Sequence, residues 1–257
     1  MRRAGQGRTC LVAAHRGGAL LWPENSLFAF GNSVALGVDF LECDVHLSKD
    51  GEVVVIHDPT LPRTTTGTGA VRGRTLAELR TLRLRDKDGR ATDEIVPTLD
   101  DVATLAAPTG IGLLVEIKAD ARRARYPGIE EKALADLDRR GITARTILTS
   151  FEADTIRRVR ELRPDVRVGA LYSPRTMRGR RASVGSEFER LAKAGILFVG
   201  LQHSLVTLEA VALAARTGLL LGAWTVNEAD GIRRCTDLGV DVLITDRPDL
   251  AKALVHP

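Results

Sequence analysis

The sequence predicts an α/β fold, a (β/α)8 TIM barrel, and three observations support this fold class. Short runs rich in valine, isoleucine and leucine alternate with amphipathic segments, as expected for parallel strands joined by crossover helices. Eight strand-then-helix units fit within 257 residues, of which 44% are hydrophobic, and this suits a barrel of ordinary size. The Gly-x-Gly-x-x-Gly turn of doubly wound sheets is missing after the first predicted strand, so an open sheet is the less favoured alternative.

Each unit pairs a predicted strand with a predicted helix. The strands are expected at residues 10–15, 40–47, 113–118, 146–151, 167–172, 196–202, 219–226 and 240–246. The helices are expected at residues 24–36, 99–107, 129–140, 152–162, 186–194, 207–217, 227–238 and 248–254. Several of these helices are followed by glycine, which readily adopts the left-handed backbone of a helix end. The glycines concerned are Gly37, Gly141, Gly195, Gly218 and Gly239.

One apolar run, residues 53–57, is additional to the eight strands. Residues 48–51 join it to the second strand, and a connection this short can close only an antiparallel hairpin. With the turn centred on positions 49 and 50, counting back along both strands places His57 opposite Glu42. We therefore expect the hairpin to return His57 to the rim of the barrel, beside the acidic residues of the second strand.

A polar stretch at residues 59–92, rich in glycine, threonine and arginine, follows this hairpin. It lies between strand-like segments and does not separate two complete cores, so it does not look like an interdomain linker. We therefore expect a single TIM-barrel domain at residues 8–257. A small insertion at residues 48–98, which contains the hairpin, would lie between the second strand and the second helix.

Three carboxylates are predicted to meet at one rim of the barrel. Because side chains alternate along a strand, Glu42 and Asp44 share one face of the second strand, and Glu116 and Lys118 share one face of the third. Both pairs lie at C-terminal strand ends, where the active sites of such barrels are found. Converging carboxylates repel one another unless a cation neutralises them, and oxygen ligands suit Mg²⁺ or Ca²⁺. For any one of these acids alone, a solvated or ion-paired surface role is the alternative.

Basic groups at the same rim favour an anionic ligand. Arg16, at the end of the first strand, can hold phosphate oxygens in bidentate fashion, and Lys118 adds a compact positive charge. The helix that follows Arg16 can direct its N-terminal amides at the same anion. His15 and His57 would flank a metal-bound phosphate, an arrangement suited to general acid–base cleavage of a P–O ester. A lone histidine at a strand end would more often be structural.

Ten short motifs occur in a fixed order from about residue 12 to residue 250. They are His15-Arg16-Gly17; Pro23-Glu24-Asn25-Ser26 with Ala29-Phe30; Glu42-x-Asp44-Val45; Lys49-Asp50-Gly51; His57-Asp58; Arg63-Thr64-Thr65; Pro97-Thr98-Leu99; Glu116-Ile117-Lys118; Trp224-Thr225-Val226-Asn227; and Ile244-Thr245-Asp246-x-Pro248. This set resembles the glycerophosphodiester phosphodiesterase family over nearly the whole chain. A single such motif would be weak, whereas ten in order are highly specific. Ser26 and Ser48 stand where the family usually has threonine, and both keep a hydroxyl.

The resemblance implies a TIM-barrel enzyme that uses a divalent cation to hydrolyse glycerophosphodiesters to sn-glycerol 3-phosphate and an alcohol. It also implies a role for each candidate residue: His15 and His57 as the acid–base pair, Glu42, Asp44 and Glu116 as metal ligands, and Arg16 and Lys118 as phosphate contacts. Which histidine is the acid, and whether water or the glycerol 2-hydroxyl is the nucleophile, stays open. So does the choice between Mg²⁺ and Ca²⁺.

Other polar or aromatic residues near the predicted rim have weaker claims. Trp224, at the end of the seventh strand, could form a wall for glycerol or a head group, or could pack within the barrel. His46 lies further out along the hairpin and is left out of the site, and His203 follows the sixth strand without a clear role. Cys43 should point away from the carboxylates into the core. The basic loop at residues 174–181 could bind an anionic group or be an ordinary solvated loop.

Composition indicates which binding partners and which cellular location to expect. The formal net charge is +4 and the isoelectric point about 9.2, but the basic residues are scattered, and aromatic residues are only 4% of the chain. A small-molecule phosphodiester is therefore expected as partner and a nucleic acid is not. Three cysteines without a C-x-x-C pair favour a reducing, cytoplasmic location, and no apolar stretch is long enough for stable membrane insertion. The oligomeric state is not predicted.

Two other functions compete with this assignment. The same histidine pair and cation could act on lipid diesters as a lysophospholipase D, although the predicted rim loops lack an exposed apolar cluster for a lipid chain. The barrel could also be catalytically inactive and serve as a binding module. All the expected site positions carry competent residues, which argues against the inactive barrel.

Overall fold

Eight parallel strands close into a barrel in the computed structural model, which describes residues 10–178 and 184–255. Around the barrel the strands follow the order β1-β2-β4-β5-β6-β7-β8-β9, and β9 pairs with β1 to close the ring. Their bounds are β1 Leu11–Ala14, β2 Phe40–Leu47, β4 Gly112–Ile117, β5 Thr146–Ser150, β6 Arg167–Tyr172, β7 Phe198–Gln202, β8 Leu220–Trp224 and β9 Val242–Thr245. Each lies on one of the eight predicted strands, and the predicted fold class is confirmed.

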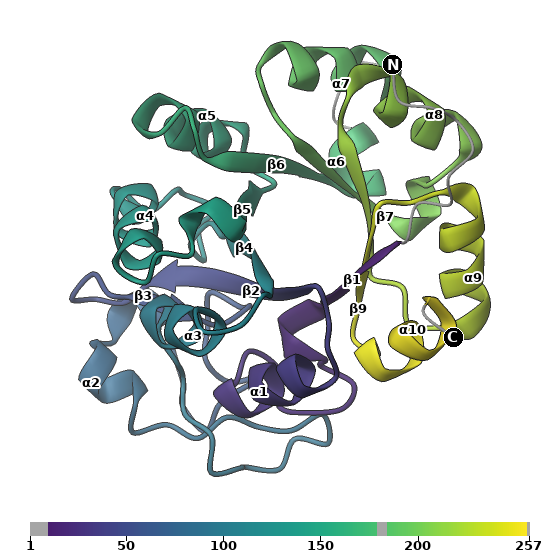
Figure 1. The fold of residues 1–257 in the computed structure, drawn as a ribbon. Coiled ribbons are helices and arrows are strands. Elements are labelled where there is room, and N and C mark those ends of the chain that lie inside the picture. The colour runs from purple at the N-terminus through teal and green to yellow at the C-terminus, as the bar shows by residue number, and fades with distance from the viewer. Residues whose placement is uncertain (1–9, 179–183, 256–257) are drawn as a thin grey trace.

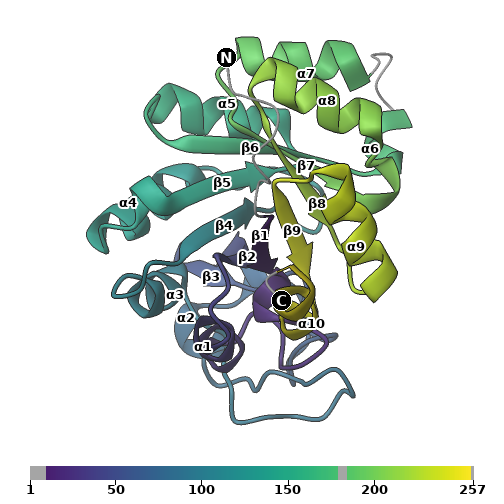
Figure 2. The same ribbon diagram turned by 45° about the vertical axis from the view of Figure 1, so that its right-hand side comes forward.

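Helices surround the ring of strands on its outside (Figures 1 and 2). Those that match the predicted helices are α1 Leu27–Ala35, α3 Leu99–Ala106, α4 Ile129–Arg139, α5 Ala153–Leu162, α7 Val184–Lys193, α8 Leu208–Thr217, α9 Ala229–Leu238 and α10 Pro248–Val255. Two short helices were not predicted, α2 Leu76–Leu79 and α6 Pro174–Arg178. The predicted basic loop at 174–181 is thus helical in its first part, and residues 179–181 lie outside the described residues.

Local sequence signals explain where these helices begin and end. The Ser26 hydroxyl accepts a hydrogen bond from the Ala29 amide at 3.0 Å, which caps α1, and Thr98 with Asp101 forms a reciprocal capping box on α3. Helices α8 and α9 end at Gly218 and Gly239, whose φ angles of 76° and 88° are unfavourable for residues that carry a Cβ atom.

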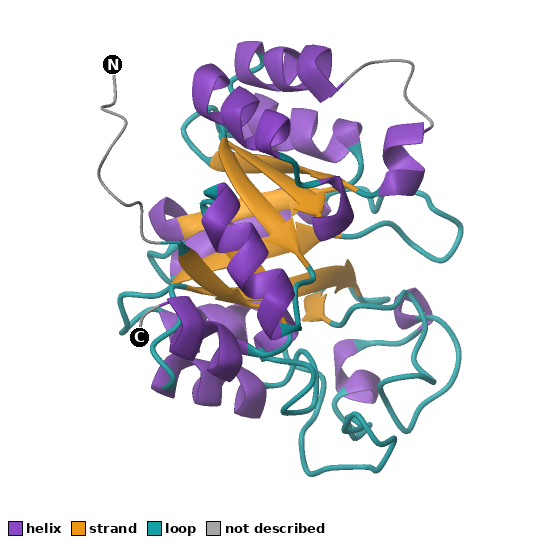
Figure 3. Ribbon diagram, turned by 90° about the vertical axis from the view of Figure 1, so that its right-hand side faces the viewer, coloured by secondary structure: helices purple, strands orange, loops and turns teal. Residues whose placement is uncertain are grey.

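Two layers of buried side chains lie on the two sides of the ring of strands. Helices enclose this ring (Figure 3). The larger layer lies between strands and helices and includes Leu41, Cys43 and Val45 of β2, so Cys43 is a core residue as predicted. The smaller layer fills the barrel interior and contains Ala13, Leu114, Ile147, Leu171, Phe198, Val242 and Ile244. The alternation along β2 therefore turns Glu42 and Asp44 towards the inside of the barrel.

The predicted hairpin forms, but its predicted register was wrong by one residue. Strand β3, Val53–Val55, runs antiparallel to β2, and Val55 lies opposite Val45. Continuing this register, His57 falls opposite Cys43 and not opposite Glu42. The cause is a longer turn, because the Ser48 amide bonds the Glu52 carbonyl at 3.0 Å and three residues remain between them, with Gly51 at a φ of 81°.

The remainder of the segment between β3 and α3 has a small core of its own. Val54 of β3 packs with the buried side chains of this segment, which are Ile56, Leu61, Val71, Leu79, Leu84 and Val96. In Figure 1 the segment carries α2 and runs past α1 and α3 at one side of the barrel. Among the described residues, no helix has the length and apolar character needed to cross a bilayer.

The tight interior around Phe198 gives a stability prediction. A Cβ atom added at Gly222 or Gly169 would overlap the Phe198 ring, so these glycines leave the space that the ring occupies. We expect Gly222→Ala to lower the free energy of unfolding by about 1–3 kcal/mol, because a packed interior cannot take the extra methyl group. Urea denaturation measures the change. Gly31→Ala in α1, where nothing lies within 4 Å, is the control and should not destabilise. Equal stabilities for both variants would contradict this packing.

Candidate active site

A cavity of about 290 Å³ opens at the C-terminal ends of the barrel strands. Its lining residues include one group with ionisable side chains and another with apolar side chains. The ionisable side chains are His15, Arg16, Glu42, His57, Glu116 and Lys118. The apolar side chains are Leu114, Phe151, Leu171, Phe198, Trp224 and Ile244. Of the predicted site residues, only Asp44 does not line the cavity, and it lies buried directly behind it.

The structure brings the three predicted carboxylates together. Asp44 and Glu116 are direct partners in the register between β2 and β4, and Glu42 lies two residues before Asp44 on the same face. One oxygen of each carboxylate lies within 4.8 Å of the others, and all three residues are buried. Burial and the neighbouring charge of Asp44 raise the pKa of Glu42 to about 8. Such a cluster is stable as three anions only if cations surround it.

Two basic side chains partly neutralise this triad. Lys118 Nζ lies 2.8 Å from Glu116 Oε1 and 3.4 Å from Asp44 Oδ1, and Arg16 Nε lies 3.4 Å from Asp44 Oδ2. Although burial opposes it, Lys118 and Arg16 hold the pKa of Asp44 below its usual value. Asp44 Oδ1 is buried and accepts no hydrogen bond from the described residues. An all-oxygen set with one unsatisfied buried oxygen fits a hard divalent cation.

The backbone between β1 and α1 also approaches the triad. Arg16 has a left-handed φ of 52°, and its amide N–H donates to Glu42 Oε2 at 2.9 Å. Asn25, at a φ of 57°, donates from its side chain to Asp44 Oδ2 at 3.1 Å. Left-handed backbone is costly for residues other than glycine and is kept where the surrounding structure requires it. Asn25 was not among the predicted site residues, although it lies in the Pro-Glu-Asn-Ser motif.

His15 is oriented by a carboxylate from the last strand of the barrel. Its Nδ1 lies 2.6 Å from Asp246 Oδ1, and its Nε2 faces Glu42 Oε2 at 4.0 Å. Burial alone would lower the pKa of His15, but the charges of Glu42 and Asp246 outweigh it and raise the pKa. Asn227 donates to Asp246 Oδ2 at 2.8 Å and holds this carboxylate in place. Sequence reasoning assigned no role to Asp246 or Asn227, although both belong to recognised motifs.

His57 has a carboxylate partner of the same kind. Its Nδ1 lies 2.6 Å from Asp58 Oδ1, and the Arg63 guanidinium bonds both oxygens of Asp58, at 2.6 and 3.1 Å. Arg63 also bonds both oxygens of Glu24, which pairs with Arg16 at 3.1 Å. Burial, together with the charges of Lys118 and Arg16, lowers the pKa of His57. Glu24, Asp58 and Arg63 are therefore site residues that sequence reasoning left without a role.

The remaining candidates lie near the cavity or away from it. Trp224 lines the apolar side and packs edge-to-face on Phe151, with ring centroids 5.6 Å apart. His46 is fully buried behind the cavity, and burial lowers its pKa to about 4. His203, in a short 3-10 turn after β7, does not line the cavity. Its carbonyl accepts a hydrogen bond from Arg234.

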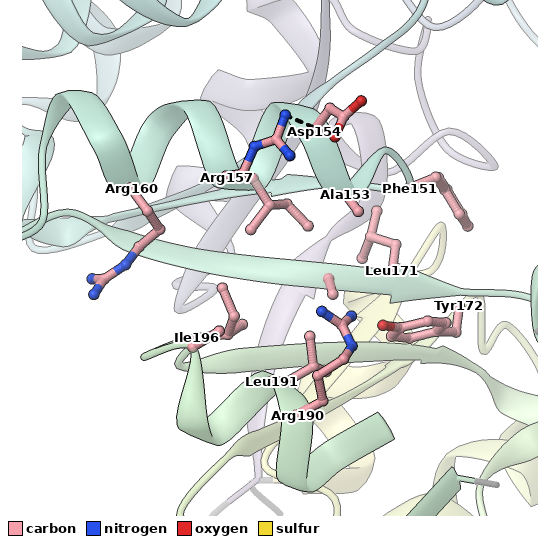
Figure 4. Close-up of a pocket in the computed structure, with 13 residues that line it drawn as sticks. Phe151, Ala153, Asp154, Arg157, Arg160, Leu171, Tyr172, Arg190, Leu191 and Ile196 are labelled. Carbon is pink, nitrogen blue, oxygen red and sulfur yellow. Dashed lines mark ion pairs between the residues drawn. The ribbon is translucent and has the colours of Figure 1, made fainter. Parts of the chain in front are cut away.

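A second cavity, of about 310 Å³, lies outside the barrel between α5 and α7 (Figure 4). Three arginines line it, and each has a described partner. Arg157 pairs with Asp154 at 3.1 Å, Arg190 pairs with Glu187 at 2.7 Å, and Arg160 donates to the Pro164 carbonyl at 2.6 Å. None of the predicted site residues lines this cavity. The cavity at the strand ends is therefore the candidate active site.

Comparison with known proteins relates the chain to one enzyme family. A family model described as the glycerophosphoryl diester phosphodiesterase family matches residues 15–250. A glycerophosphodiester phosphodiesterase of Caldanaerobacter subterraneus is 34% identical over 96% of this chain and 98% of its own length. A crystal structure from Agrobacterium tumefaciens is similar with a TM-score of 0.88 and 29% identity, covering 96% of this chain and 97% of that one. An Oleispira antarctica phosphodiesterase, solved with the product sn-glycerol 3-phosphate, has a TM-score of 0.81 and 26% identity, with 96% and 97% coverage.

The carboxylate cluster predicts stabilisation by a hard divalent cation. A cation that binds only the folded state at about 100 times its dissociation constant stabilises by about 2.7 kcal/mol, which raises Tm by several degrees. We expect MgCl2 or CaCl2 to produce such a shift by differential scanning fluorimetry. Glu116→Gln should reduce it, because one anionic ligand is lost. Glu131→Gln, at a surface ion pair with Arg158, is the control and should keep the full shift. An unchanged shift in Glu116→Gln would exclude Glu116 as a ligand.

Proposed function

Because this chain belongs to the glycerophosphoryl diester phosphodiesterase family, we propose that it hydrolyses glycerophosphodiesters to sn-glycerol 3-phosphate and an alcohol by acid–base catalysis at His15 and His57. One observation carries the proposal. Two imidazoles, each with Nδ1 bonded to a carboxylate, border the same cavity as Glu42 and Glu116 of the buried acidic triad. The product seen in the Oleispira antarctica enzyme supports the substrate class.

The two histidines have the features of a proton-transferring pair. Since Asp246 and Asp58 each occupy an Nδ1 atom, the Nε2 atoms are left to exchange protons with a ligand. The pKa of His15 is raised and that of His57 is lowered, so at any given pH His15 holds its proton more readily than His57 does. This difference supports His15 as the general acid and His57 as the general base.

Glu42, Asp44 and Glu116 would hold the divalent cation, Mg²⁺ or Ca²⁺. When bound there, the cation would neutralise the phosphoryl oxygens and lower the barrier to attack at phosphorus. Arg16 and Lys118 lie beside the triad and would contact the remaining phosphate oxygens. These five side chains would fix the phosphate, while the histidines act on the attacking and leaving oxygens.

Trp224 would form a wall for the uncharged parts of the substrate. Its side of the cavity contributes only apolar, aromatic and hydroxyl side chains among the described lining residues. Glycerol carbons and the head group of a diester could lie against this wall, where burial of their methylene groups contributes to binding. The wall supports selection for small alcohols and leaves the head group itself to be measured.

Release of the head-group alcohol tests the proposal, because a lysophospholipid cleaved at the same bond would give a lysophosphatidic acid and not sn-glycerol 3-phosphate. The substrates are glycerophosphoethanolamine, glycerophosphocholine and a lysophospholipid, each with Mg²⁺ or Ca²⁺ and with EDTA. We expect the first two to be cleaved and EDTA to abolish the release. Preferred cleavage of the lysophospholipid would replace the proposal with a lysophospholipase D activity, and no cleavage of any substrate would favour a binding module.

Substitution of either histidine tests its catalytic role. We expect His15→Ala and His57→Ala each to lower kcat by about 10²–10⁴-fold, because each removes one proton-transfer partner. Circular dichroism and Tm should show that both variants remain folded. His203→Ala is a matched control outside the cavity and should keep full activity. A near-native rate in either site variant would remove that histidine from the mechanism.

The pH profile tests which histidine is the acid. If His57 is the base, kcat/KM rises with pH through its pKa, which lies below the ordinary value of 6.5. If His15 is the acid, kcat/KM falls as pH rises through its pKa, which lies above 6.5. Asp246→Asn removes a partner that raises the pKa of His15, so the falling limb should move to lower pH. Asp58→Asn should move the rising limb to lower pH in the same way. The opposite pairing of variants and limbs would exchange the two roles.

A further inference from the structure

A buried chain of hydrogen bonds lies behind His57. His46 of β2 is completely buried, and its Nε2 lies 3.1 Å from the backbone carbonyl oxygen of His57. Its other nitrogen, Nδ1, lies 2.9 Å from the hydroxyl of Tyr126, and the two rings meet edge-to-face at 82°. His46 therefore connects the chain at His57 with the loop between β4 and α4, which carries Tyr126.

The partners of His46 determine its protonation pattern. A carbonyl oxygen can only accept a hydrogen bond, so the contact with His57 requires a hydrogen on Nε2 of His46. In the neutral ring Nδ1 is then an acceptor, and the Tyr126 hydroxyl is the donor that it meets. Tyr126 thus favours the tautomer of His46 that donates to His57.

Tyr126 is itself held by the insertion and by its own loop. The Arg72 guanidinium lies over the Tyr126 ring, 5.5 Å from the centroid, and Arg72 pairs with Asp120 at 2.9 Å. Asp120 also accepts hydrogen bonds from the backbone amides of Arg122 and Ala124, at 2.8 and 2.9 Å. The phenol is 1% exposed. Contacts from the insertion and from its own loop therefore hold Tyr126 in place independently of its hydrogen bond to His46.

The hydrogen bond from His46 to the His57 carbonyl lies beyond the other described bonds between β2 and the β3 segment. Pairing between β2 and β3 ends at Val55, and the next bond joins the Ile56 amide to the Asp44 carbonyl at 3.0 Å. Asp58 orients the His57 ring, but it is the adjacent residue, and its described hydrogen bonds join it to Arg63 and not to β2. Within the described residues, the His46 bond to the His57 carbonyl is the one that fastens His57 itself to β2.

We propose that His46 is a positioning residue that fixes the backbone of His57 relative to the acidic triad, and that Tyr126 sets the tautomer of His46 that does so. This inference rests on the proposed catalytic role of His57. Loss of the bond would let the His57 segment move away from the cavity while the cation ligands and the substrate wall stay in place. Loss of the bond should therefore lower kcat and leave KM nearly unchanged.

Steady-state kinetics with glycerophosphocholine and a saturating divalent cation test the inference. We expect His46→Ala to lower kcat by about 10²-fold with KM nearly unchanged, since a displacement of about 1 Å can cost that much. His46→Gln keeps an N–H donor near the Nε2 position and should recover most of the loss. Tyr126→Phe keeps the ring and removes only the donor to His46, so kcat should fall by about tenfold, the equivalent of one hydrogen bond.

Tyr172→Phe is the matched control for loss of a buried phenol. Its hydroxyl donates to Glu187 of α7, and Tyr172 does not line the active-site cavity. This variant should lower Tm and leave kcat unchanged. A folded His46→Ala with wild-type kcat overturns the inference, and if that variant does not fold, wild-type kcat in Tyr126→Phe overturns it. His57→Ala is measured in parallel, because full activity there would overturn the proposed function and not this inference alone.

Discussion

Mutual repulsion among Glu42, Asp44 and Glu116 is the constraint on which the rest of the site depends. Three buried acids whose oxygens lie within 4.8 Å of one another cannot all be ionised without nearby positive charge. Lys118, Arg16 and the Arg16 amide all point at these acids, and Arg16 takes up a left-handed backbone in doing so. The local structure at the ends of β1, β2 and β4 thus serves to keep the acids together.

The histidines add a second level of organisation around this cluster. His15 depends on Asp246 and Asn227, which come from the far end of the chain and reach it only because β9 closes against β1. His57 depends on contacts that are closer in sequence, through Asp58 and Arg63. Closure of the barrel and folding of the insertion are therefore both needed before the two imidazoles can face one ligand. Positioning in such sites contributes as much to catalysis as the identity of the groups.

Sequence periodicity was sufficient for the barrel and for the acidic face of β2, because strand alternation and helix caps are local properties. It failed by one residue at His57, since the turn that ends at Glu52 depends on the left-handed Gly51 and not on counting alone. His46 was left out because it lies further out along the hairpin, and its contact with Tyr126, 80 residues away, has no local sequence signal. The domain limits, the catalytic and metal-binding roles and the cellular location stay predictions.

The cavity draws its two chemical characters from separate stretches of the chain. Every ionisable lining residue among those described lies between His15 and Lys118, whereas the lining residues from Thr149 to Ile244 are hydroxyl, aromatic or aliphatic. Substitutions in the later stretch can therefore change the shape and polarity offered to the alcohol without altering the charges that act on phosphorus. Divergence of leaving-group preference within such a scaffold would need no redesign of its reaction chemistry, and the C-terminal half would be the natural target for a combinatorial library.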